Sequence, residues 1–230
     1  MLVVAGSNPA LTTNKTTMKV QLINITPNAE KHIAKVARVS SSRNDKQSDY
    51  VGLINYLMKH KHWSPFEHAY ATFEIETSKA IGIQLIRHRS FTFQEFSQRY
   101  QDVNLLGDMF EPVELRKQCD NNRQSSTEIF APKIEVAGGV IEAQHLIQEH
   151  LLLSEKLYNR LISAGVAREQ ARMILPMCTK TKIHMTGSIR SWIHFLDLRD
   201  DGHAQKEIQL VAKEVRSYLS KELPVIFGNE

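Results

Sequence analysis

Three cationic residues stand at the end of an apolar run, and this arrangement constrains the chain more than any other feature. Arg87-His88-Arg89 directly follows Ala80–Ile86, whose apolar character is typical of a packed element. Glu95, Ser97 and Arg99 then alternate along the next segment. Cations at the end of a packed element, with polar groups close behind, indicate a site for an anionic ligand. The alternative is a solvated basic helix end, which the helix dipole favours.

Length and composition describe an ordinary globular protein. The 230 residues suffice for one sizeable core, with 42% hydrophobic and 23% charged residues. The net charge of +4 is mild and scattered, so it suits anionic small molecules as readily as nucleic acid. The two cysteines are too few for a disulfide scaffold or a thiolate zinc site, so we expect a reducing, cytoplasmic location. No apolar stretch approaches the roughly 18 residues that a membrane span needs.

The first residues differ from the rest of the chain. Gly6–Thr17 is rich in Ser, Thr and Asn and has no hydrophobic period. The first alternating pattern begins at Met18. We therefore expect a disordered leader over 1–17 and a single folded domain over 18–230.

Hydrophobic periodicity predicts a mixed domain. Strands are expected at 19–25, 70–76, 93–101 and 179–187, and helices at 28–39, 50–60, 78–89, 136–164, 167–175, 189–198 and 203–219. Ser78 is a favourable helix N-cap, and Gly165 occupies the position expected after a helix end. Residues 118–128 are polar and predict a loop. The fold class is thus α+β, a helix-rich single domain around an antiparallel sheet.

Two sets of polar side chains are expected to face one cavity. Gln84, Arg87 and His88 stand at i, i+3 and i+4 and would share one helix face. The next predicted strand would present three side chains on one face: Glu95, Ser97 and Arg99. Guanidinium groups suit phosphate oxygens, and amides or carboxylates can read a base or a sugar hydroxyl.

Further cations lie near the C-terminus. Arg168 and Arg172 are four residues apart on a short helix, and Arg172 lies among apolar residues, which favours an inward role. Arg190 and His194 share a face of the next helix, and Arg199 stands at its end. A solvated face and a salt-bridged helix terminus are the alternatives for these groups.

A cluster of histidines allows a metal interpretation. His60, His62 and His68, together with Glu67, could ligate zinc or iron. Because the two halves of the cluster straddle a proline turn and nothing else specifies the geometry, we expect no metal.

Nucleophilic catalysis is weakly supported. Cys178 and Ser97 have no histidine or acid at an interpretable spacing, and free cysteines are usually small buried hydrophobes.

No glycine-rich dinucleotide turn or phosphate loop is present, so a dinucleotide would have to bind by other means.

The arginine segment is one of several motifs that identify a family. Arg87-His88-Arg89, seven residues and Ser97 resemble the signature of the flavin-dependent thymidylate synthases. Thr92 and Gln94 depart conservatively from the Ser and Asn that are usual there. The other blocks similar to the family occur in its order: His62–His68, Arg168–Pro176, Gly187–Phe195, Leu198-Arg199 and His203–Ile208.

The resemblance implies an activity and an assembly. The enzyme would methylate dUMP to dTMP, with methylenetetrahydrofolate as carbon donor and with FAD, recharged by NADPH, as hydride source. It would be a homotetramer whose sites lie between subunits. It would act on small molecules, without a nucleic acid or membrane partner.

The resemblance also implies roles for individual residues. The implied FAD ligands are Ser40, His62, Ser64, Glu67, Arg87, His88, Arg89, Glu95, Ser188, Arg190, His194 and His203. The implied dUMP ligands are Gln84, Arg87, Glu95, Ser97, Gln98, Arg99, Arg172 and Arg199. Arg199 would also be catalytic, by polarising the pyrimidine. Two other classes remain as rivals, a basic nucleic-acid-binding protein and a metal-dependent hydrolase.

Overall fold

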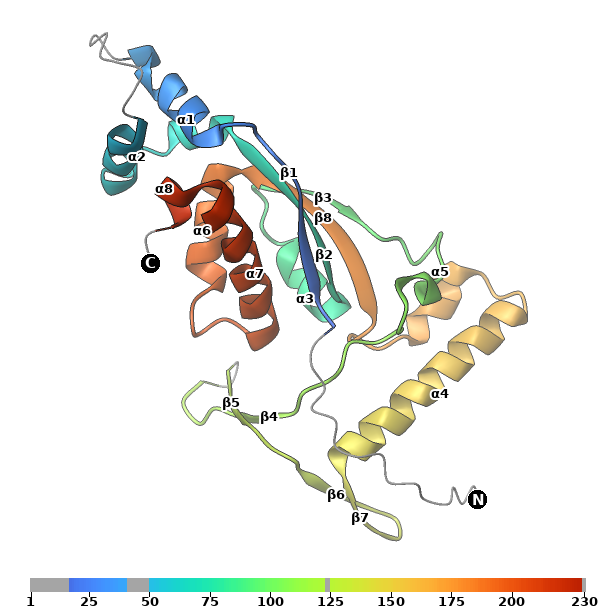
Figure 1. Ribbon diagram of the computed structural model, residues 1–230. Coiled ribbons are helices and arrows are strands. Elements are labelled where there is room, and N and C mark those ends of the chain that lie inside the picture. The colour runs from blue at the N-terminus through green and yellow to red at the C-terminus, as the bar shows by residue number, and fades with distance from the viewer. Residues whose placement is uncertain (1–16, 41–49, 123–124, 229–230) are drawn as a thin grey trace.

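The centre of the protein is a four-stranded antiparallel sheet. The computed structural model describes residues 17–40, 50–122 and 125–228, so the expected leader lies, apart from Thr17, outside the described residues. The strand order is β1-β2-β8-β3. The bounds are Lys19–Ile25 for β1, Tyr70–Ser78 for β2, Thr92–Glu95 for β3 and Lys180–Ser188 for β8. The expected α+β domain with an antiparallel sheet is confirmed (Figure 1).

Alternation along the strands gives the sheet one apolar and one polar face. In β2, Phe73 and Ile75 are fully buried. They share a core with residues of α6 (Ile189–Arg199) and α7 (Lys206–Glu222). On the polar face, Lys182 Nζ lies 3.2 Å from a Glu74 oxygen and 2.9 Å from a Glu76 oxygen. Two helices therefore cover one face, and ion pairs lie on the other.

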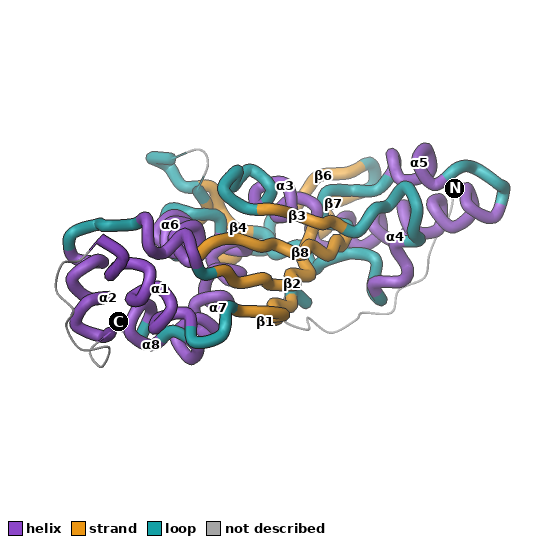
Figure 2. Tube along the Cα trace, turned by 90° about the horizontal axis from the view of Figure 1, so that it is seen from above, coloured by secondary structure: helices purple, strands orange, loops and turns teal. Residues whose placement is uncertain are grey.

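Most of the remaining helices lie at the two ends of an elongated molecule, whereas α3 packs beside the sheet near its middle. Figure 2 shows α1, α2 and α8 grouped with α6 and α7 at one end, and α4 and α5 at the other. The bounds are Ala29–Ala37 (α1), Tyr50–Lys59 (α2), Lys79–Leu85 (α3), Ala143–Ser163 (α4), Arg168–Ala171 (α5) and Pro224–Phe227 (α8). Short 3₁₀ helices are η1 (Arg38–Ser40), η2 (Ser64–His68), η3 (Val103–Leu106) and η4 (Arg172–Ile174). In the described ranges, no helix has the length and apolar character needed to cross a membrane.

The helix predicted over 78–89 begins as expected and ends early. Ser78 Oγ accepts a hydrogen bond from the Ile81 N–H, which confirms the N-cap. The helix stops at Leu85, and the His88 N–H donates to the Leu85 carbonyl in a tight turn. The prediction that Gln84, Arg87 and His88 share a helix face is therefore wrong. Local spacing favoured continuation, but the following residues pack against the sheet instead.

The strand predicted over 93–101 is also shorter. β3 lies at the sheet edge and ends at Glu95. The Ser97 carbonyl accepts from the N–H groups of Tyr100 and Gln101, which closes a turn. Gln98 is buried whereas Arg99 is exposed. The expectation of one common face for Glu95, Ser97 and Arg99 is therefore wrong, because the strand gives way to a turn.

The long helix predicted over 136–164 is divided. Its first part forms a hairpin of β6 (Lys133–Val136) and β7 (Gly139–Glu142), and α4 starts only at Ala143. Gly138 and Gly139 have φ values of 108° and 148°, which suit a turn and oppose a helix. A second hairpin, β4 (Arg116–Gln118) and β5 (Ser126–Ile129), flanks the polar loop.

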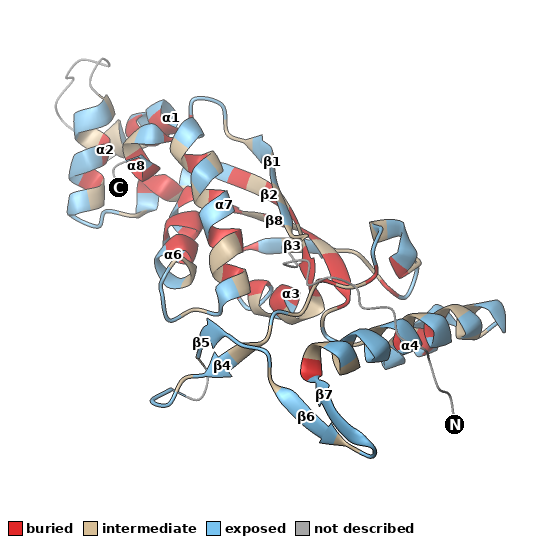
Figure 3. Ribbon diagram, turned by 60° about the horizontal axis from the view of Figure 1, so that its bottom comes forward, coloured by how far each residue is buried: buried red, intermediate tan, exposed pale blue. Residues whose placement is uncertain are grey.

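Helix α4 stands apart from the main core. A small second cluster joins it to neighbouring segments through Val103, Met109, Tyr158 and Ala171. Figure 3 shows buried residues concentrated on the sheet, α6 and α7, with α4 largely exposed. Three leucines of α4 have large exposed fractions: Leu152 (54%), Leu153 (65%) and Leu157 (43%). Within the described chain, this helix therefore keeps an uncovered apolar face.

We expect Gly187→Ala to destabilise the fold. A Cβ at Gly187 would lie 2.4 Å from the buried Phe91 ring, so the ring would have to move. The cost should be about 1–3 kcal/mol, as for other overpacked cores. Urea unfolding of both proteins measures it. Gly202→Ala is the control, since a Cβ there meets nothing within 4 Å. Equal stability of the two variants would contradict this account.

Candidate functional site

The turn that carries Arg87, His88 and Arg89 is attached to the sheet and to α6. The Phe91 ring lies directly over Gly187 of β8 and makes an edge contact with Trp192, at 4.7 Å between ring centroids. Ser191 Oγ of α6 donates to the Ser90 carbonyl at 3.3 Å. The expected basic segment is thus placed by tertiary contacts rather than by a continuing helix.

The three basic residues of the turn lie in different environments. Arg87 and Arg89 are exposed, whereas His88 is buried. Arg199 Nε donates to His88 Nε2 at 3.0 Å. Burial, with the nearby charges of Arg199 and His194, lowers the pKa of His88 from 6.5 to about 4. At neutral pH the imidazole is uncharged, so it can accept this hydrogen bond.

A second group lies at the N-terminus of α6. Ser188 caps this helix by accepting from the Ser191 N–H, and its Oγ donates to Glu67 Oε2 at 2.5 Å. Arg190 Nη1 donates to Glu67 Oε1 at 2.8 Å. The structure therefore brings together three implied FAD ligands from η2, β8 and α6, because the carboxylate joins a hydroxyl and a guanidinium.

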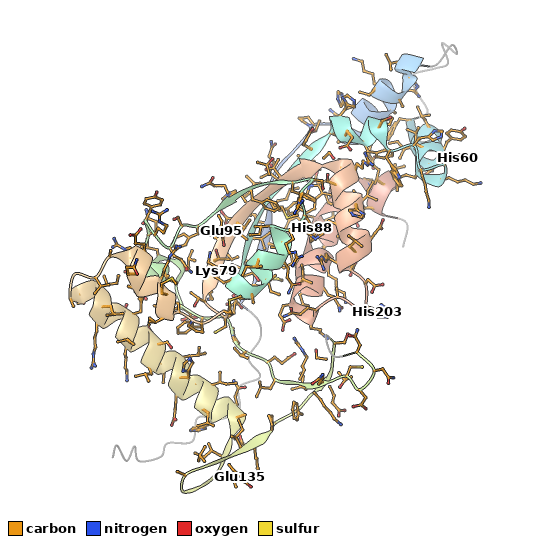
Figure 4. All side chains as sticks on the ribbon, turned by 180° about the vertical axis from the view of Figure 1, so that it is seen from behind. His60, Lys79, His88, Glu95, Glu135 and His203 are labelled. Carbon is orange, nitrogen blue, oxygen red and sulfur yellow. The ribbon has the colours of Figure 1, made fainter. Side chains whose placement is uncertain are left out.

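A third group surrounds Glu95 at the end of β3. Glu95 Oε1 lies 2.7 Å from Lys79 Nζ and accepts from Thr181 Oγ1 at 2.8 Å. Figure 4 shows the Lys79 and Glu95 side chains next to one another. Gly82 lets α3 approach β8 closely, since a Cβ there would lie 3.1 Å from Thr181 Cγ2. The hydrogen bonds from Lys79 and Thr181 thus both end on the same oxygen of the Glu95 carboxylate.

The remaining dUMP candidates lie in the turn after β3 and on η4. Arg99 Nη2 lies 3.3 Å from Glu169 Oε2, and both side chains are about half exposed. Arg172 is partly buried on η4, and Ser97 is partly buried beside the turn. Gln98 is 6% exposed, and its Nε2 atom has no hydrogen-bond partner in the described part of the chain. Buried amide donors are normally satisfied, so this one is notable.

The other implied FAD ligands are mostly exposed. Ser64, His62 and His194 are exposed, and His203 Nδ1 lies 2.7 Å from Asp201 Oδ1. Ser40 ends η1, and its side chain lies outside the described residues. Figure 4 places His203 well away from His88. The implied ligands thus fall into several separate groups within the chain.

The histidine cluster forms an aromatic group. The His60 and His62 rings both pack against Tyr56, with centroid distances of 4.3 and 5.9 Å. Across residues 17–40, 50–122 and 125–228, no three His, Cys, Asp or Glu side chains are grouped so as to hold a metal ion.

The environment of Cys178 does not favour a thiolate. Its thiol is partly buried, and burial, with a smaller effect of the Glu111 charge, raises its pKa. A thiol nucleophile needs the opposite shift.

Comparison with known proteins identifies the family. Residues 21–225 match the sequence model of the family described as thymidylate synthase complementing protein. A probable flavin-dependent thymidylate synthase from Paramecium bursaria Chlorella virus 1 is 39% identical over 217 residues, covering 91% of this chain and 97% of that protein. The chain belongs to this family. The resemblance based on the sequence motifs is thereby confirmed.

Two further proteins similar to this chain extend the comparison. The flavin-dependent thymidylate synthase of Synechocystis sp. is 39% identical over 194 residues, covering 84% of this chain and 86% of that protein. The crystal structure of a UMP/dUMP methylase, PolB from Streptomyces cacaoi bound with 5-Br dUMP, aligns with a TM-score of 0.73 at 29% identity. That alignment covers 93% of this chain and 94% of PolB.

The structure of this family member shows a series of linked side-chain hydrogen bonds that the sequence did not reveal. Gln84 Nε2 donates to Gln205 Oε1 at 2.6 Å, and Gln205 Nε2 donates to Glu207 Oε2 at 2.8 Å. Arg116 of β4 donates to Glu207 Oε1 at 2.5 Å. The motif His203–Ile208 contained Gln205 and Glu207, but only His203 received a role. Nothing local to Arg116 indicated its partner, which is 91 residues away.

We expect the Arg116–Glu207 pair to stabilise the protein at neutral pH and not in acid. Burial is the largest effect and raises the pKa of Glu207, but the hydrogen bonds from Arg116, from its own backbone N–H and from Gln205, with the charge of Arg116, together outweigh it, so the net pKa lies below 4.5. A lowered folded-state pKa contributes stability above the unfolded value, and this is lost as the pH falls through the folded value. Wild type should exceed Glu207→Gln in free energy of unfolding at pH 7, with the gap narrowing below about pH 4.5.

Urea unfolding across this pH range measures the gap. Glu214→Gln, on an exposed position of the same helix, is the control and should show little difference at any pH. A gap for Glu207→Gln that stays constant down to pH 3 would rule out the charged pair as its source.

Proposed function

We propose that this protein catalyses the reductive methylation of dUMP to dTMP. Methylenetetrahydrofolate is the carbon donor, and NADPH is the reductant that regenerates reduced FAD. The geometric observation that carries the proposal is the gathering of guanidinium groups at the end of α6. Arg199 contacts His88, and the exposed Arg87 and Arg89 flank that residue. Such a group of cations suits a nucleotide and a dinucleotide in adjacent positions.

The chemistry of the donor set fits FAD. Arg87 and Arg89 present exposed guanidiniums, which match diphosphate oxygens. Glu67 accepts from the Ser188 hydroxyl and from Arg190, and the remaining N–H groups of the Arg190 guanidinium are further donors. The residues that would hold the cofactor are Ser40, His62, Ser64, Glu67, Arg87, His88, Arg89, Glu95, Ser188, Arg190, His194 and His203. When bound, reduced FAD supplies the hydride.

Several features support nucleotide binding by the implied dUMP ligands. The unpaired amide nitrogen of buried Gln98 offers a donor to a ligand oxygen. Arg99 forms an exposed ion pair with Glu169, worth about 1 kcal/mol or less, and also lies 5.7 Å from the Tyr100 ring centroid, so a phosphate can displace Glu169 at little cost. The dUMP ligands would be Gln84, Arg87, Glu95, Ser97, Gln98, Arg99, Arg172 and Arg199.

Arg199 is the catalytic residue in this proposal. Carbon 5 of the pyrimidine reacts only when negative charge develops on the ring nitrogen N3 and its neighbouring oxygens. A fixed guanidinium beside the ring stabilises that charge without reorganising during the reaction. The raised pKa of Cys178 opposes a thiolate at that position, and in this proposal the base is activated through charge rather than through a covalent bond.

We further propose a homotetramer with active sites between subunits. Among the implied dUMP ligands, Arg99 pairs with Glu169 of α5 and Arg172 lies on η4 next to α4 and α5, whereas Arg199 lies at the end of α6. In the assembly, Arg99 and Arg172 of one subunit would join Arg199 of a neighbouring subunit in one active site. The exposed leucines of α4 support an interface there, since a lone subunit leaves them in water.

Arg199→Ala should lower turnover by roughly 100-fold or more, as for the loss of one preorganised charge. The absorbance of bound FAD should remain, because other residues hold the cofactor. Lys213→Ala, which removes an exposed cation from α7, is the control and should leave turnover near normal. Near-normal turnover of Arg199→Ala would remove this residue from the mechanism.

The overall reaction is tested with purified protein and FAD. The protein should acquire a flavin absorbance spectrum and release tritium from 5-tritiated dUMP when NADPH and methylenetetrahydrofolate are present. Stoichiometric metal without flavin would favour the hydrolase. Binding to nucleic acid that falls steeply with salt, without flavin uptake, would favour the nucleic-acid-binding protein.

Leu153→Glu should dissociate the assembly. A charge on the exposed apolar face of α4 would be buried without a partner in the proposed interface. Light scattering of the wild type should give the mass of four subunits, and that of the variant a smaller mass. Ile129→Glu, at a similarly exposed position of β5 (67%, against 65% for Leu153), is the control and should keep the wild-type mass. A tetrameric Leu153→Glu protein would exclude α4 from the interface.

A further inference from the structure

The middle residue of the arginine turn has a different environment from its neighbours. Arg87 and Arg89 are exposed, as expected for groups that meet a ligand, but His88 is 9% exposed. Its Nε2 atom accepts from Arg199 Nε at 3.0 Å. The two residues are 111 positions apart, so the contact joins the turn after α3 to the end of α6.

The His88 ring is held by its neighbours. Its centroid lies 5.1 Å from that of Phe195 and 6.2 Å from that of Phe91, both in edge-to-face geometry. Phe91 in turn is pressed against Gly187. The backbone N–H of His88 donates to the Leu85 carbonyl at 3.0 Å. The imidazole therefore has little freedom to rotate, and its Nε2 atom is a fixed acceptor.

The protonation state of the ring agrees with this geometry. An imidazole that accepts at Nε2 must carry its proton at Nδ1. Burial and the charges of Arg199 and His194 disfavour the doubly protonated form, since they lower its pKa to about 4. At neutral pH His88 is an uncharged acceptor, and it leaves the positive charge of Arg199 uncompensated.

The use of Nε restricts how Arg199 can face a ligand. A guanidinium has five N–H groups in a planar fork, and the Nε group lies on one side of it. Fixing that group orients the plane and leaves the terminal Nη1 and Nη2 groups for a partner beyond the side chain. A carboxylate in place of His88 would orient the group equally well but would neutralise the charge.

We propose that His88 is a positioning residue that holds the Arg199 guanidinium in its productive orientation while leaving its charge available to the pyrimidine. This inference rests on the proposed function, in which Arg199 acts on dUMP. It gives His88 a role toward the substrate side of the site, beyond the binding of FAD.

The first test compares two substitutions of His88. His88→Phe keeps a ring and removes the acceptor, and turnover should fall about 10- to 100-fold, the range for a hydrogen bond to a charged group. The KM for dUMP and the absorbance of bound FAD should change much less. His88→Gln offers an amide oxygen near the Nε2 position and should recover most of the turnover. Equal losses of turnover in His88→Phe and His88→Gln would overturn the proposal. Loss of bound FAD in proportion to the loss of turnover would also overturn it.

A double-mutant cycle separates positioning from a general structural effect. If His88 acts through Arg199, His88→Phe should have no further effect on turnover in the Arg199→Ala background. If the two effects multiply, the residues act independently and the proposal is wrong.

A measurement that does not use activity completes the test. In ¹⁵N-labelled wild-type protein the Arg199 Nε–H proton should exchange slowly with solvent, and His88 Nε2 should show the chemical shift of an unprotonated nitrogen. Exchange should be fast in His88→Phe and slow again in His88→Gln. Fast exchange in the wild type would overturn the proposal even if His88→Phe did not fold. Slow exchange in a protein that released no tritium from dUMP would instead refute the proposed function alone.

Discussion

The close contact between the Phe91 ring and Gly187 is the constraint on which the candidate site depends. The ring occupies the space that a Cβ at 187 would fill, so the turn of the chain after α3 toward the sheet requires a glycine at this position. Because Gly187 lies one residue before the cap of α6, the same contact places the basic turn beside that helix. The site is thus assembled where β8 passes into α6.

The choice of acceptor distinguishes Arg199 from three other cations near the site. Lys79, Arg99 and Arg190 each contact a carboxylate, which offsets their charge locally. Arg199 Nε contacts the neutral imidazole of His88. Because the orienting group is uncharged, it does not offset the positive charge of Arg199, which can therefore act on a ligand. Solvent and salt screen this charge only weakly in a partly buried position.

Sequence periodicity predicted the elements whose side chains meet a regular environment. β2 and β8 alternate between core and polar face, and α7 carries a continuous apolar stripe, so the local pattern sufficed. Prediction failed for Val136–Glu142 because the apolar spacing there resembled a helix, whereas Gly138 and Gly139 adopt positive φ and form a hairpin. It failed again after Leu85, where a long-range packing contact ended a helix that local propensity would have continued.

The sequence by itself determined the family and most of the residues named for the site, because the motif blocks occur in order along the chain. Tertiary structure alone decided which member of the arginine turn is buried, that His88 meets Arg199, and that Arg116 reaches Glu207. The physical reason is distance along the chain: these partners are separated by 111 and 91 residues. A local pattern specifies the environment that a side chain prefers, but only the packing of the sheet against α6 and α7 specifies which partner occupies it.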